Sequence, residues 1–399
     1  MESRGLQPDF CAGLQSHPAF FGSTPRLASH GVLSEIKRET LNVKRKTEIT
    51  HYLRITFYAS RFMQRRNKMS RTVLVTGANG FTGSYVCKHL IQRGDRVRAL
   101  VRKTGNLDLL KGVDVEYVHG DLAGDSLNET LAAALKGVEV IYHLAAVYRT
   151  EGVPKKYFWD VHVDGTRRLL EAARRSNVSR FVHCSTVGVQ GEIKNPPATE
   201  EAPFAPGDVY QQSKMEGEKL ARQFFQEHDF PGVIVRPVGI YGPGDTRFLK
   251  LFKFIYNGKF RMLGSGKVLY HMTYVDDLAR GILLAGEKKE ALGQVFTIGG
   301  NGYLTLAELV ERVAAALNVP VPRKSFPVWP VWFAGLLCEI ACRPFGLEPP
   351  LYRRRVEFFM KDRAFDISKA KRLLGYQPQV DLDTGLRLTA DWYRAQNLL

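Results

Sequence analysis

The sequence predicts an α/β fold, in which a doubly wound parallel sheet is followed by a smaller C-terminal cap. Short β-branched strands alternate with amphipathic helices from residue 72 onward, and three glycines follow the first strand. After about residue 237 the alternation gives way to pieces separated by glycine and proline. Strands separated by helices indicate a parallel sheet covered on both faces, and the later pieces indicate a second, smaller unit.

The elements of the predicted sheet follow from their apolar patterns. The first strand is "TVLVT" (72–76), and the helix after it, "SYVCKHLIQRG", ends at Gly94, a residue type that often closes helices. Further helices are expected between Pro154 and Asn177 and around Tyr210, and in the cap at 305–318. The other strands are "RVRALVR" (96–102), "VEYVHGD" (115–121), "VEVIYHLAA" (138–146), "SRFVHCST" (179–186) and "GVIVRPVGIYG" (232–242).

The chain divides into three segments. Residues 1–69 lack sustained periodicity, and we interpret them as a disordered arm or as a mis-called extension before a natural start at Met69. Residues 70–236 carry the strand–helix alternation. Residues 237–399 are expected to form mainly the substrate-binding cap, with some late strands and helices returning to the first domain.

Composition narrows the class of protein. Apolar residues make up 44% of the 399 residues and charged residues 24%, as in a soluble globular chain. The net charge of +17 is spread out, +7 in residues 1–69 and +10 in the rest, without a nucleic-acid recognition motif. We therefore expect no nucleic-acid partner. A mild positive field suits an anionic small ligand or an acidic membrane surface.

Cysteine usage indicates a reducing compartment, and we expect a cytoplasmic location. Five cysteines are scattered along the chain, which does not resemble a disulfide framework. Cys338 and Cys342 have no His or Cys neighbours at metal-ligand spacing, so no metal site is expected.

Residues 326–346, "FPVWPVWFAGLLCEIACRPFG", form an apolar run in the cap. Pro330 and Glu339 interrupt it, and it falls short of the ~20 apolar residues that a membrane span needs, so no transmembrane helix is expected. Two interpretations stay open: a cap helix that lines an apolar pocket, and a peripheral helix on a membrane surface.

Three glycines at positions 77, 80 and 83, in "VLVTGANGFTG", predict a dinucleotide-binding turn. Glycine lets the backbone turn sharply, lets a pyrophosphate approach, and lets the next helix pack on the strand with its N-terminus toward the phosphates. The spacing G-x-x-G-x-x-G differs from the usual G-x-G-x-x-G, but its place after the first strand favours this interpretation over a purely structural turn. Residues 70–236 are therefore predicted to be a Rossmann-type NAD(P)-binding domain. The cofactor-binding residues expected in the turn are Gly77, Asn79, Gly80, Phe81, Thr82 and Gly83.

Arg102 and Lys103 follow the second strand, where the adenosine ribose would lie. A carboxylate there would accept hydrogen bonds from the ribose hydroxyls and favour NAD, whereas cations can pair with a 2′-phosphate. We therefore expect NADP or NAD, with NADP slightly favoured. Asp121, after the third strand, would accept from the adenine amino group or would instead cap the next helix.

Tyr210 and Lys214, in "GDVYQQSKMEGEK", lie four residues apart on one face of the expected helix. A pair at this spacing also arises by chance, so its meaning depends on other motifs in the chain. These are "TGANGFTG" (76–83), "GDL" (120–122), "HLAA" (143–146), "STVGVQG" (185–191) and "RPVGIYGPGD" (236–245). Their order resembles that of extended short-chain dehydrogenases/reductases, the NAD-dependent epimerase/dehydratase superfamily, which includes 3β-hydroxysteroid dehydrogenases and dihydroflavonol reductases. The resemblance covers about residue 71 to the C-terminus and implies a homodimer.

The resemblance implies a role for each motif residue. Tyr210 would be the acid–base group, while Lys214 would lower its pKa and hold the nicotinamide ribose, because a nearby ammonium favours the phenolate of a group that ordinarily titrates near ~10. Thr186 would orient the substrate oxygen, with Ser185 as second choice. Further cofactor contacts are implied at Leu122, Leu144, Ala145, Ala146 and Pro237.

Two departures from the family pattern qualify the resemblance, and one further residue agrees with it. Val187 and Gly188 stand where sugar 4,6-dehydratases of the superfamily carry an Asp-Glu pair, so water elimination of that type is not expected. His162 stands where the family often has Asn, and we interpret it as structural rather than catalytic. Arg236 resembles the arginine that ends a strand in the family.

The predicted function is reversible hydride transfer between NAD(P) and a secondary alcohol or ketone. Arg247 and Tyr148 are candidate substrate residues, although Arg247 could equally be a surface arginine. The substrate would be a nucleotide sugar, contacted by Arg247 and Arg353–Arg355, or a sterol-like alcohol, bound by the apolar cap segment. The alternatives are a non-catalytic NAD(P) sensor and a membrane-associated scaffold on the same fold.

Overall fold

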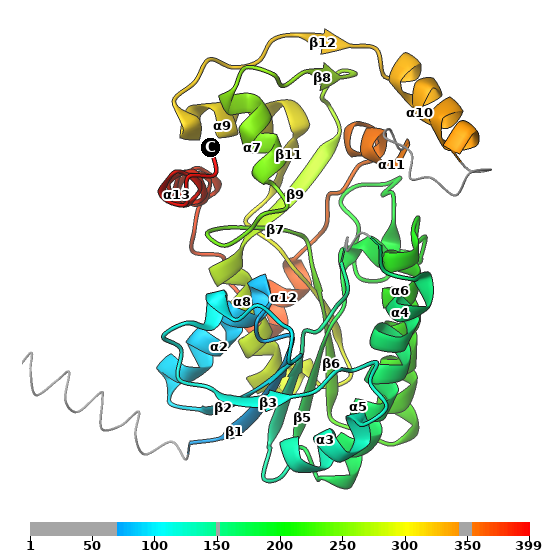
Figure 1. The fold of residues 1–399 in the computed structure, drawn as a ribbon, viewed down its shortest axis with the longest axis vertical. Helices are drawn as coiled ribbons and strands as arrows, with labels where there is room; N and C mark the ends of the chain where they lie inside the picture. Colours follow the sequence, from blue (N-terminus) through cyan, green and yellow to red (C-terminus); the bar gives the residue numbers. More distant parts are fainter. Residues whose placement is uncertain (1–69, 149–151, 343–352) are drawn as a thin grey trace, which may run out of the picture. The chain divides into compact units, whose positions relative to one another are not determined.

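The computed structural model describes residues 70–148, 152–342 and 353–399 and confirms the predicted α/β class. The expectations for residues 1–69 lie outside the described residues. In the described part, helices cover both faces of a seven-stranded sheet, and two smaller sheets form the cap (Figure 1).

The central sheet is parallel throughout, with the order β10-β6-β5-β4-β1-β2-β3. All residues of β1, β4 and β10 are buried, as expected of strands covered on both faces. The order reverses between β1 and β4, which is where open α/β sheets bind ligands. The strands are β1 (Thr72–Thr76), β2 (Arg96–Val101), β3 (Glu116–His119), β4 (Val140–His143), β5 (Arg180–Cys184), β6 (Gly232–Pro237) and β10 (Val295–Ile298).

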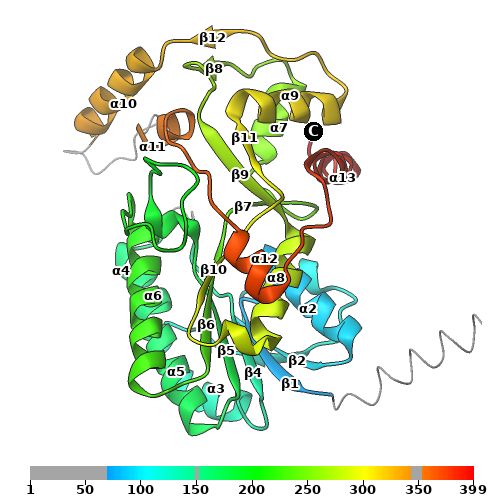
Figure 2. The same ribbon diagram turned by 180° about the vertical axis from the view of Figure 1, so that it is seen from behind.

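Two layers of helices cover the sheet (Figures 1 and 2). One layer is α2 (Phe81–Arg93), α8 (Val275–Glu287) and α12 (Ser368–Leu374), and the other is α3 (Leu127–Ala134), α4 (Lys155–Trp159), α5 (Gly165–Arg175) and α6 (Val209–Glu227). Each layer has its own apolar core, with Val86 and Leu278 in the first and Leu131 and Phe225 in the second. Three late elements, α8, β10 and α12, therefore lie in the first domain.

The strand expected over residues 232–242 is divided at Pro237. Pro237 has no N–H to donate, and the next residue, Val238, donates its backbone N–H to Ile298 O at 3.1 Å. The chain then leaves the central sheet as β7 (Gly239–Tyr241), which pairs with β9 (Leu269–Tyr274). The cap therefore starts at the carboxyl end of β6.

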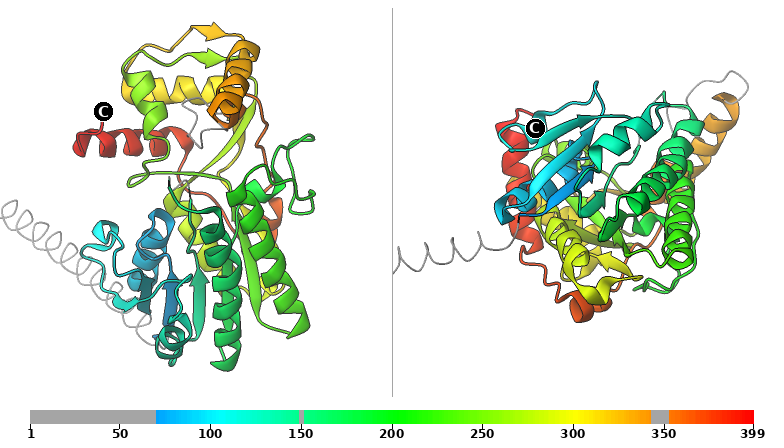
Figure 3. Two further views of the ribbon diagram at one scale, coloured as in Figure 1. Left: turned by 45° about the vertical axis from the view of Figure 1, so that its right-hand side comes forward. Right: turned by 90° about the horizontal axis from the view of Figure 1, so that it is seen from below.

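The cap has two small sheets and five helices among the described residues (Figure 3). The helix expected over 305–318 begins with a capping box between Thr305 and Glu308 and ends at Asn318 in the left-handed conformation. The further elements are β8 (Met262–Leu263), β11 (Tyr303–Thr305), β12 (Ser325–Phe326), α7 (Leu249–Tyr256), α9 (Leu306–Leu317), α10 (Val328–Cys342), α11 (Arg353–Val356) and α13 (Leu382–Ala395).

A π-helical turn, Asp160–Asp164, joins α4 to α5 inside the helix that the sequence predicted as regular. Helix α6 packs directly on this turn. A Cβ added at Gly217 would lie 2.2 Å from the carbonyl oxygen of His162, so only glycine permits this approach.

We predict that Gly217→Ala destabilises the fold. Alanine is the better helix former by about 1 kcal/mol, but overpacking against a backbone oxygen costs about 1–3 kcal/mol and should outweigh that gain. Urea unfolding measures the free energy of unfolding. Gly302→Ala is the matched control, because nothing lies within 4 Å of a Cβ there, and it should leave stability nearly unchanged. A Gly217→Ala protein as stable as the wild type would contradict the packing described.

Candidate active site

The glycine-rich turn after β1 lies against the loop that follows β4. Gly77 has a φ of +68°, and a Cβ there would lie 2.7 Å from Ala145 N and Cα. A Cβ at Gly83 would lie 2.0 Å from Gly77 O, so the start of α2 rests directly on the turn. Gly80 caps α2 without a side chain, and the first helical turn has no acidic residue. The N-terminal N–H groups of α2 therefore suit a pyrophosphate, and these residues fit a dinucleotide.

The loop after β2 folds back onto the glycine-rich turn. Asn79 Nδ2 donates to the carbonyl of Asn106 at 2.9 Å, and a Cβ at Gly105 would lie 2.8 Å from the same nitrogen. Phe81 and Thr82 are partly buried at the start of α2, whereas Arg102 and Lys103 are exposed.

Arg102, Tyr157 and Asp121 form a chain of hydrogen bonds at the ends of β2 and β3. Arg102 Nη1 donates to the Tyr157 hydroxyl at 3.3 Å, and that hydroxyl donates to Asp121 Oδ2 at 3.0 Å. Asp121 Oδ1 also accepts from Ala123 N at 3.0 Å, as in a local turn. Tyr157 was not predicted as a site residue, because it comes from α4, 36 residues after Asp121.

Tyr210 lies in the first turn of α6, which Asp208 caps by accepting from Gln211 N at 2.8 Å. The Tyr210 ring packs edge-on against Tyr148, with centroids 4.8 Å apart, and against His162 at 5.7 Å. The loop after β4 contacts Gly77 through Ala145 and contacts the Tyr210 ring through Tyr148. This loop therefore joins the glycine-rich turn to the phenol.

Lys214 is buried one helical turn later and faces the end of β5. Its Nζ donates to Cys184 O at 2.6 Å. Burial lowers the pKa of Lys214, against the opposing effect of Glu218. Burial, followed by Tyr148, raises the pKa of the Tyr210 phenol, and Arg247 opposes that shift. In this structure burial therefore acts against the acidification of Tyr210 that the sequence led us to expect.

The two candidate hydroxyls after β5 have different partners. Ser185 is buried, and its Oγ donates to Glu218 Oε2 at 2.5 Å. Thr186 is partly buried, and its Oγ1 accepts a hydrogen bond from Gly188 N at 3.1 Å. The Thr186 hydroxyl is the acceptor in this bond, so the bond does not use the hydroxyl proton. This geometry favours Thr186 over Ser185 as donor to a substrate oxygen.

A buried ion pair holds α6 against the sheet. Arg236 Nη2 and Nε, in β6, donate to the two oxygens of Glu218 at 2.6 and 3.0 Å, and both side chains are at most 1% exposed. Arg236 Nη1 donates to Glu200 O at 2.8 Å. Glu218 is a site residue that the sequence analysis missed, although its position four residues after Lys214 places it on the same helix face.

Two neutral histidines connect the helices around the site. Val147 N donates to His162 Nε2 at 2.9 Å, so the Nδ1 proton of His162 points to Ser213 Oγ at 2.8 Å. Ser213 in turn donates to Tyr210 O at 3.0 Å. His162 therefore ties the loop after β4 to the first turn of α6.

His143, at the end of β4, lies between two hydroxyls. Thr166 donates to His162 O at 2.8 Å, so His143 Nε2 donates to Thr166 Oγ1 at 2.9 Å, and Nδ1 accepts from Thr76 at 2.8 Å. Burial, followed by the charge of Lys214, lowers the pKa of His143 to about 3.

The remaining predicted residues lie around this centre. Arg247 donates to Asp245 Oδ1 at 2.6 Å and to Ile240 O at 2.9 Å, and its guanidinium lies 5.2 Å from the centroid of the Phe81 ring. Asp245 therefore neutralises part of the charge of this guanidinium. Arg354 and Arg355 have side chains outside the described ones. Leu122 is buried, Leu144 and Ala145 partly buried, Ala146 exposed, and Pro237 buried at the end of β6.

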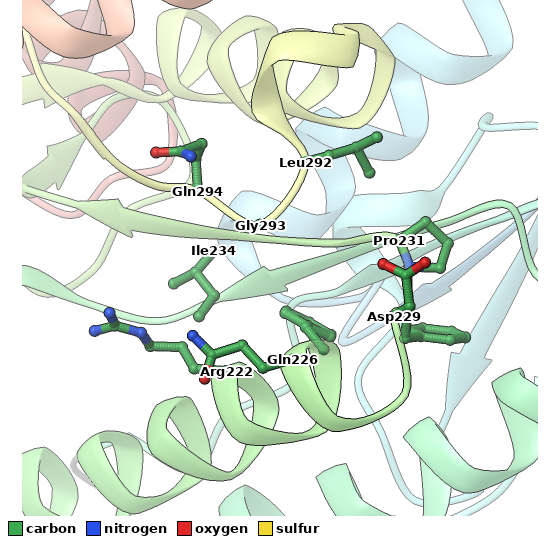
Figure 4. Close-up of a pocket in the computed structure, with 10 residues that line it drawn as sticks. Arg222, Gln226, Asp229, Pro231, Ile234, Leu292, Gly293 and Gln294 are labelled. Carbon is green, nitrogen blue, oxygen red and sulfur yellow. The ribbon is translucent and has the colours of Figure 1, made fainter.

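A cavity of about 450 Å³ lies elsewhere, at the start of β6 (Figure 4). Arg222, Gln226, Asp229, Leu292 and Gln294 are among its lining residues. Ligands of open parallel sheets bind at the carboxyl ends of the strands, so this cavity at the amino end is not the candidate active site.

The model of the NAD dependent epimerase/dehydratase family matches residues 73–299, more than half of the chain. The chain belongs to this family and is an enzyme of the extended short-chain dehydrogenase/reductase class.

The relatives are named for different substrates. The chain is 29% identical over 328 residues to 2-alkyl-3-oxoalkanoate reductase of Stenotrophomonas maltophilia (strain K279a), covering 79% of this chain and 97% of that protein. It is 28% identical over 336 residues to sterol-4-alpha-carboxylate 3-dehydrogenase, decarboxylating, of Mus musculus, covering 79% and 89%. The structure of UDP-glucuronic acid 4-epimerase from Bacillus cereus in complex with NAD matches with a TM-score of 0.66 and 26% identity, covering 82% and 99%.

We predict that His143 makes the protein less stable in acid. The unfolded chain binds a proton on this residue below a pH of ~6.5, whereas the folded protein keeps it neutral, so the free energy of unfolding falls as pH falls. Between pH ~7.5 and ~5.5, His143→Gln should lose about 1.4 kcal/mol less than the wild type in urea unfolding. His119→Gln, at an exposed histidine, should lose as much as the wild type. Equal losses in all three proteins would contradict the buried neutral state.

Proposed function

We propose that this enzyme transfers a hydride between NAD(P) and a secondary alcohol or ketone, with Tyr210, Lys214 and Thr186 as its catalytic residues. The observation that carries the proposal is the placement of all three at the carboxyl end of β5. Lys214 reaches Cys184 O, Thr186 follows Cys184 by two residues, and Tyr210 lies one turn before Lys214 on α6.

Each side chain has a chemical task in this proposal. Bound dinucleotide supplies the hydride acceptor or donor and, when oxidised, a positive charge. Tyr210 exchanges the hydroxyl proton of the alcohol, and the free proton of Thr186 hydrogen-bonds the same oxygen. The ammonium of Lys214 favours the phenolate and holds the nicotinamide ribose. Val187 and Gly188 carry no acid or base, which argues against water elimination by a pair at these positions.

We favour an apolar alcohol over a nucleotide sugar as substrate. Arg247, the candidate for an anionic substrate, is already paired with Asp245 and stacked on Phe81. Two of the relatives are named for a sterol carboxylate and for an alkyl-oxoalkanoate, which join a hydrocarbon part to one carboxylate. The pairing of Arg247 therefore counts against the diphosphate of a nucleotide sugar rather than against a single carboxylate.

Assembly and location form a separate part of the proposal. The four described cysteines, Cys87, Cys184, Cys338 and Cys342, are free thiols, which agrees with a reducing compartment such as the cytoplasm. The proposal that the protein forms a homodimer rests on the family resemblance alone.

We predict that Tyr210→Phe lowers turnover by about 100-fold or more, because the acid–base group is lost while the ring is kept. Dinucleotide affinity, followed by fluorescence, should stay within about twofold of wild type. A panel of sterols and nucleotide sugars, assayed by dinucleotide reduction, supplies the turnover. Thr186→Val should also reduce turnover, and Thr186→Ser should restore part of it.

Tyr256→Phe is the matched control, since Tyr256 is 44% exposed on α7, and it should behave as wild type. A Tyr210→Phe protein that turns over substrate normally would refute the catalytic proposal and favour the sensor.

We further propose that NADP is preferred over NAD, because exposed Arg102 and Lys103 end β2 where a carboxylate would favour NAD. Arg102→Asp should weaken NADP binding by about tenfold and strengthen NAD binding, as measured by fluorescence titration. Arg96→Asp, an exposed change at the amino end of the same strand, is the control and should leave the preference unaltered. An unaltered preference in Arg102→Asp would contradict the proposal.

A further inference from the structure

We infer that helix α10 docks on an anionic membrane surface. The helix has 15 residues and a single charge, Glu339. Trp329, Phe333, Leu337 and Ile340 follow one another at the spacing of one helix face and are 72%, 51%, 53% and 59% exposed. Among described residues, the large apolar side chains at least half exposed are these four and Phe326 of the preceding strand β12.

Helix α11 contacts the other face of α10 and pairs there with Glu339, the one charged residue of α10, so the exposed face carries no charge. Arg353, in α11, donates its backbone N–H and its Nε to Glu339 at 2.8 and 2.9 Å. The Arg353 guanidinium also lies 5.5 Å from the Trp332 ring. Gly335 is the one buried residue of the described helix, so most of α10 is accessible from outside, which favours the second of the two interpretations of this segment.

Exposed cations lie beside the amino end of α10. Strand β8 pairs with β12, which brings Arg261 next to Arg323 and Lys324, all exposed. A Cβ at Gly264, just after β8, would lie 2.8 Å from Val328 Cγ2 at the start of α10.

This combination fits a lipid surface with acidic headgroups better than a second copy of the chain. An apolar face with Trp and Phe enters the headgroup boundary, while adjacent Lys and Arg pair with anionic lipid. A second copy docked through this face would bring another set of Arg261, Arg323 and Lys324 near the first, and like charges would repel. Figures 1 and 2 show α10 at the outer end of the cap, beyond β12 and beside α11. No helix among the described residues is long and apolar enough to cross a bilayer.

The segment that carries α10 also reaches the loop before the catalytic helix. Beyond α11, Asp362 O accepts from Ile193 N at 3.1 Å and Ala364 O accepts from Ala198 N at 2.9 Å. Residues 193–198 precede α6, which carries Tyr210. A membrane contact at α10 would therefore hold the cap and this loop at the lipid surface.

Co-sedimentation of the full chain with vesicles tests the inference. Wild type should bind vesicles of phosphatidylcholine mixed with phosphatidylserine about tenfold more tightly than phosphatidylcholine alone, and added salt should reduce the difference. The double change Trp329→Glu and Phe333→Glu should reduce binding to both by about tenfold or more. Arg323→Gln with Lys324→Gln should abolish only the preference for phosphatidylserine.

Leu388→Glu, at a 42% exposed leucine on α13, is the matched control and should bind as wild type. Thermal midpoints and dinucleotide affinity must stay at wild-type values in every variant, which separates loss of docking from unfolding and from failure of the catalytic proposal. The inference is overturned if the wild-type protein stays in the supernatant with both kinds of vesicle. It is also overturned if the Trp329→Glu, Phe333→Glu variant binds vesicles as tightly as the wild type. If the wild-type protein does not bind vesicles but self-associates, and the double variant does not self-associate, the exposed face of α10 would instead contact a second copy of the chain.

Discussion

The buried ion pair between Glu218 and Arg236 is the contact on which the site geometry depends most. Glu218, Lys214 and Tyr210 recur every four residues on one face of α6, so fixing one of them on the sheet fixes the others. Two nitrogens of Arg236 and the Ser185 hydroxyl satisfy the carboxylate. Removing one partner of such a pair typically costs about 3–5 kcal/mol, because a charge is left buried without compensation. Ser185 thereby has a structural partner, which supports the proposal that Thr186 is the hydroxyl that meets the substrate.

A second set of contacts ties the same helix to the cofactor side. His162 accepts a hydrogen bond from the backbone N–H of Val147 and donates one to the Ser213 hydroxyl. Ser213 in turn donates to the carbonyl oxygen of Tyr210. The loop of Val147 begins against Gly77 of the glycine-rich turn. The glycine-rich turn and the phenol are therefore joined by packing contacts and hydrogen bonds.

Much of this architecture follows from local sequence. The alternation of strands and helices, the glycine spacing and the Tyr210–Lys214 interval are short-range signals. They predicted the parallel sheet, which the structure confirms, and the place of the proposed site, which stays a prediction. Glu218 and Tyr157 were missed because their partners, Arg236 and Asp121, are distant in sequence. The π-helical turn at Asp160–Asp164 was missed for a different reason, since it depends on the approach of α6 at Gly217. The break at Pro237 was also missed, although proline is a local signal that the strand pattern concealed.

Tyr210 lies among aromatic rings, where burial raises its pKa, and Lys214 donates one hydrogen bond to Cys184 O. Under the proposed mechanism, forming the phenolate near neutral pH therefore needs the positive charge of oxidised dinucleotide together with that of Lys214. A carbon-13 NMR titration of ring-labelled tyrosine, assigned with Tyr210→Phe, measures this directly. The account predicts that oxidised NADP lowers the pKa of Tyr210 by about one unit or more, and that Lys214→Met diminishes the shift. The same pKa with and without the dinucleotide would contradict it.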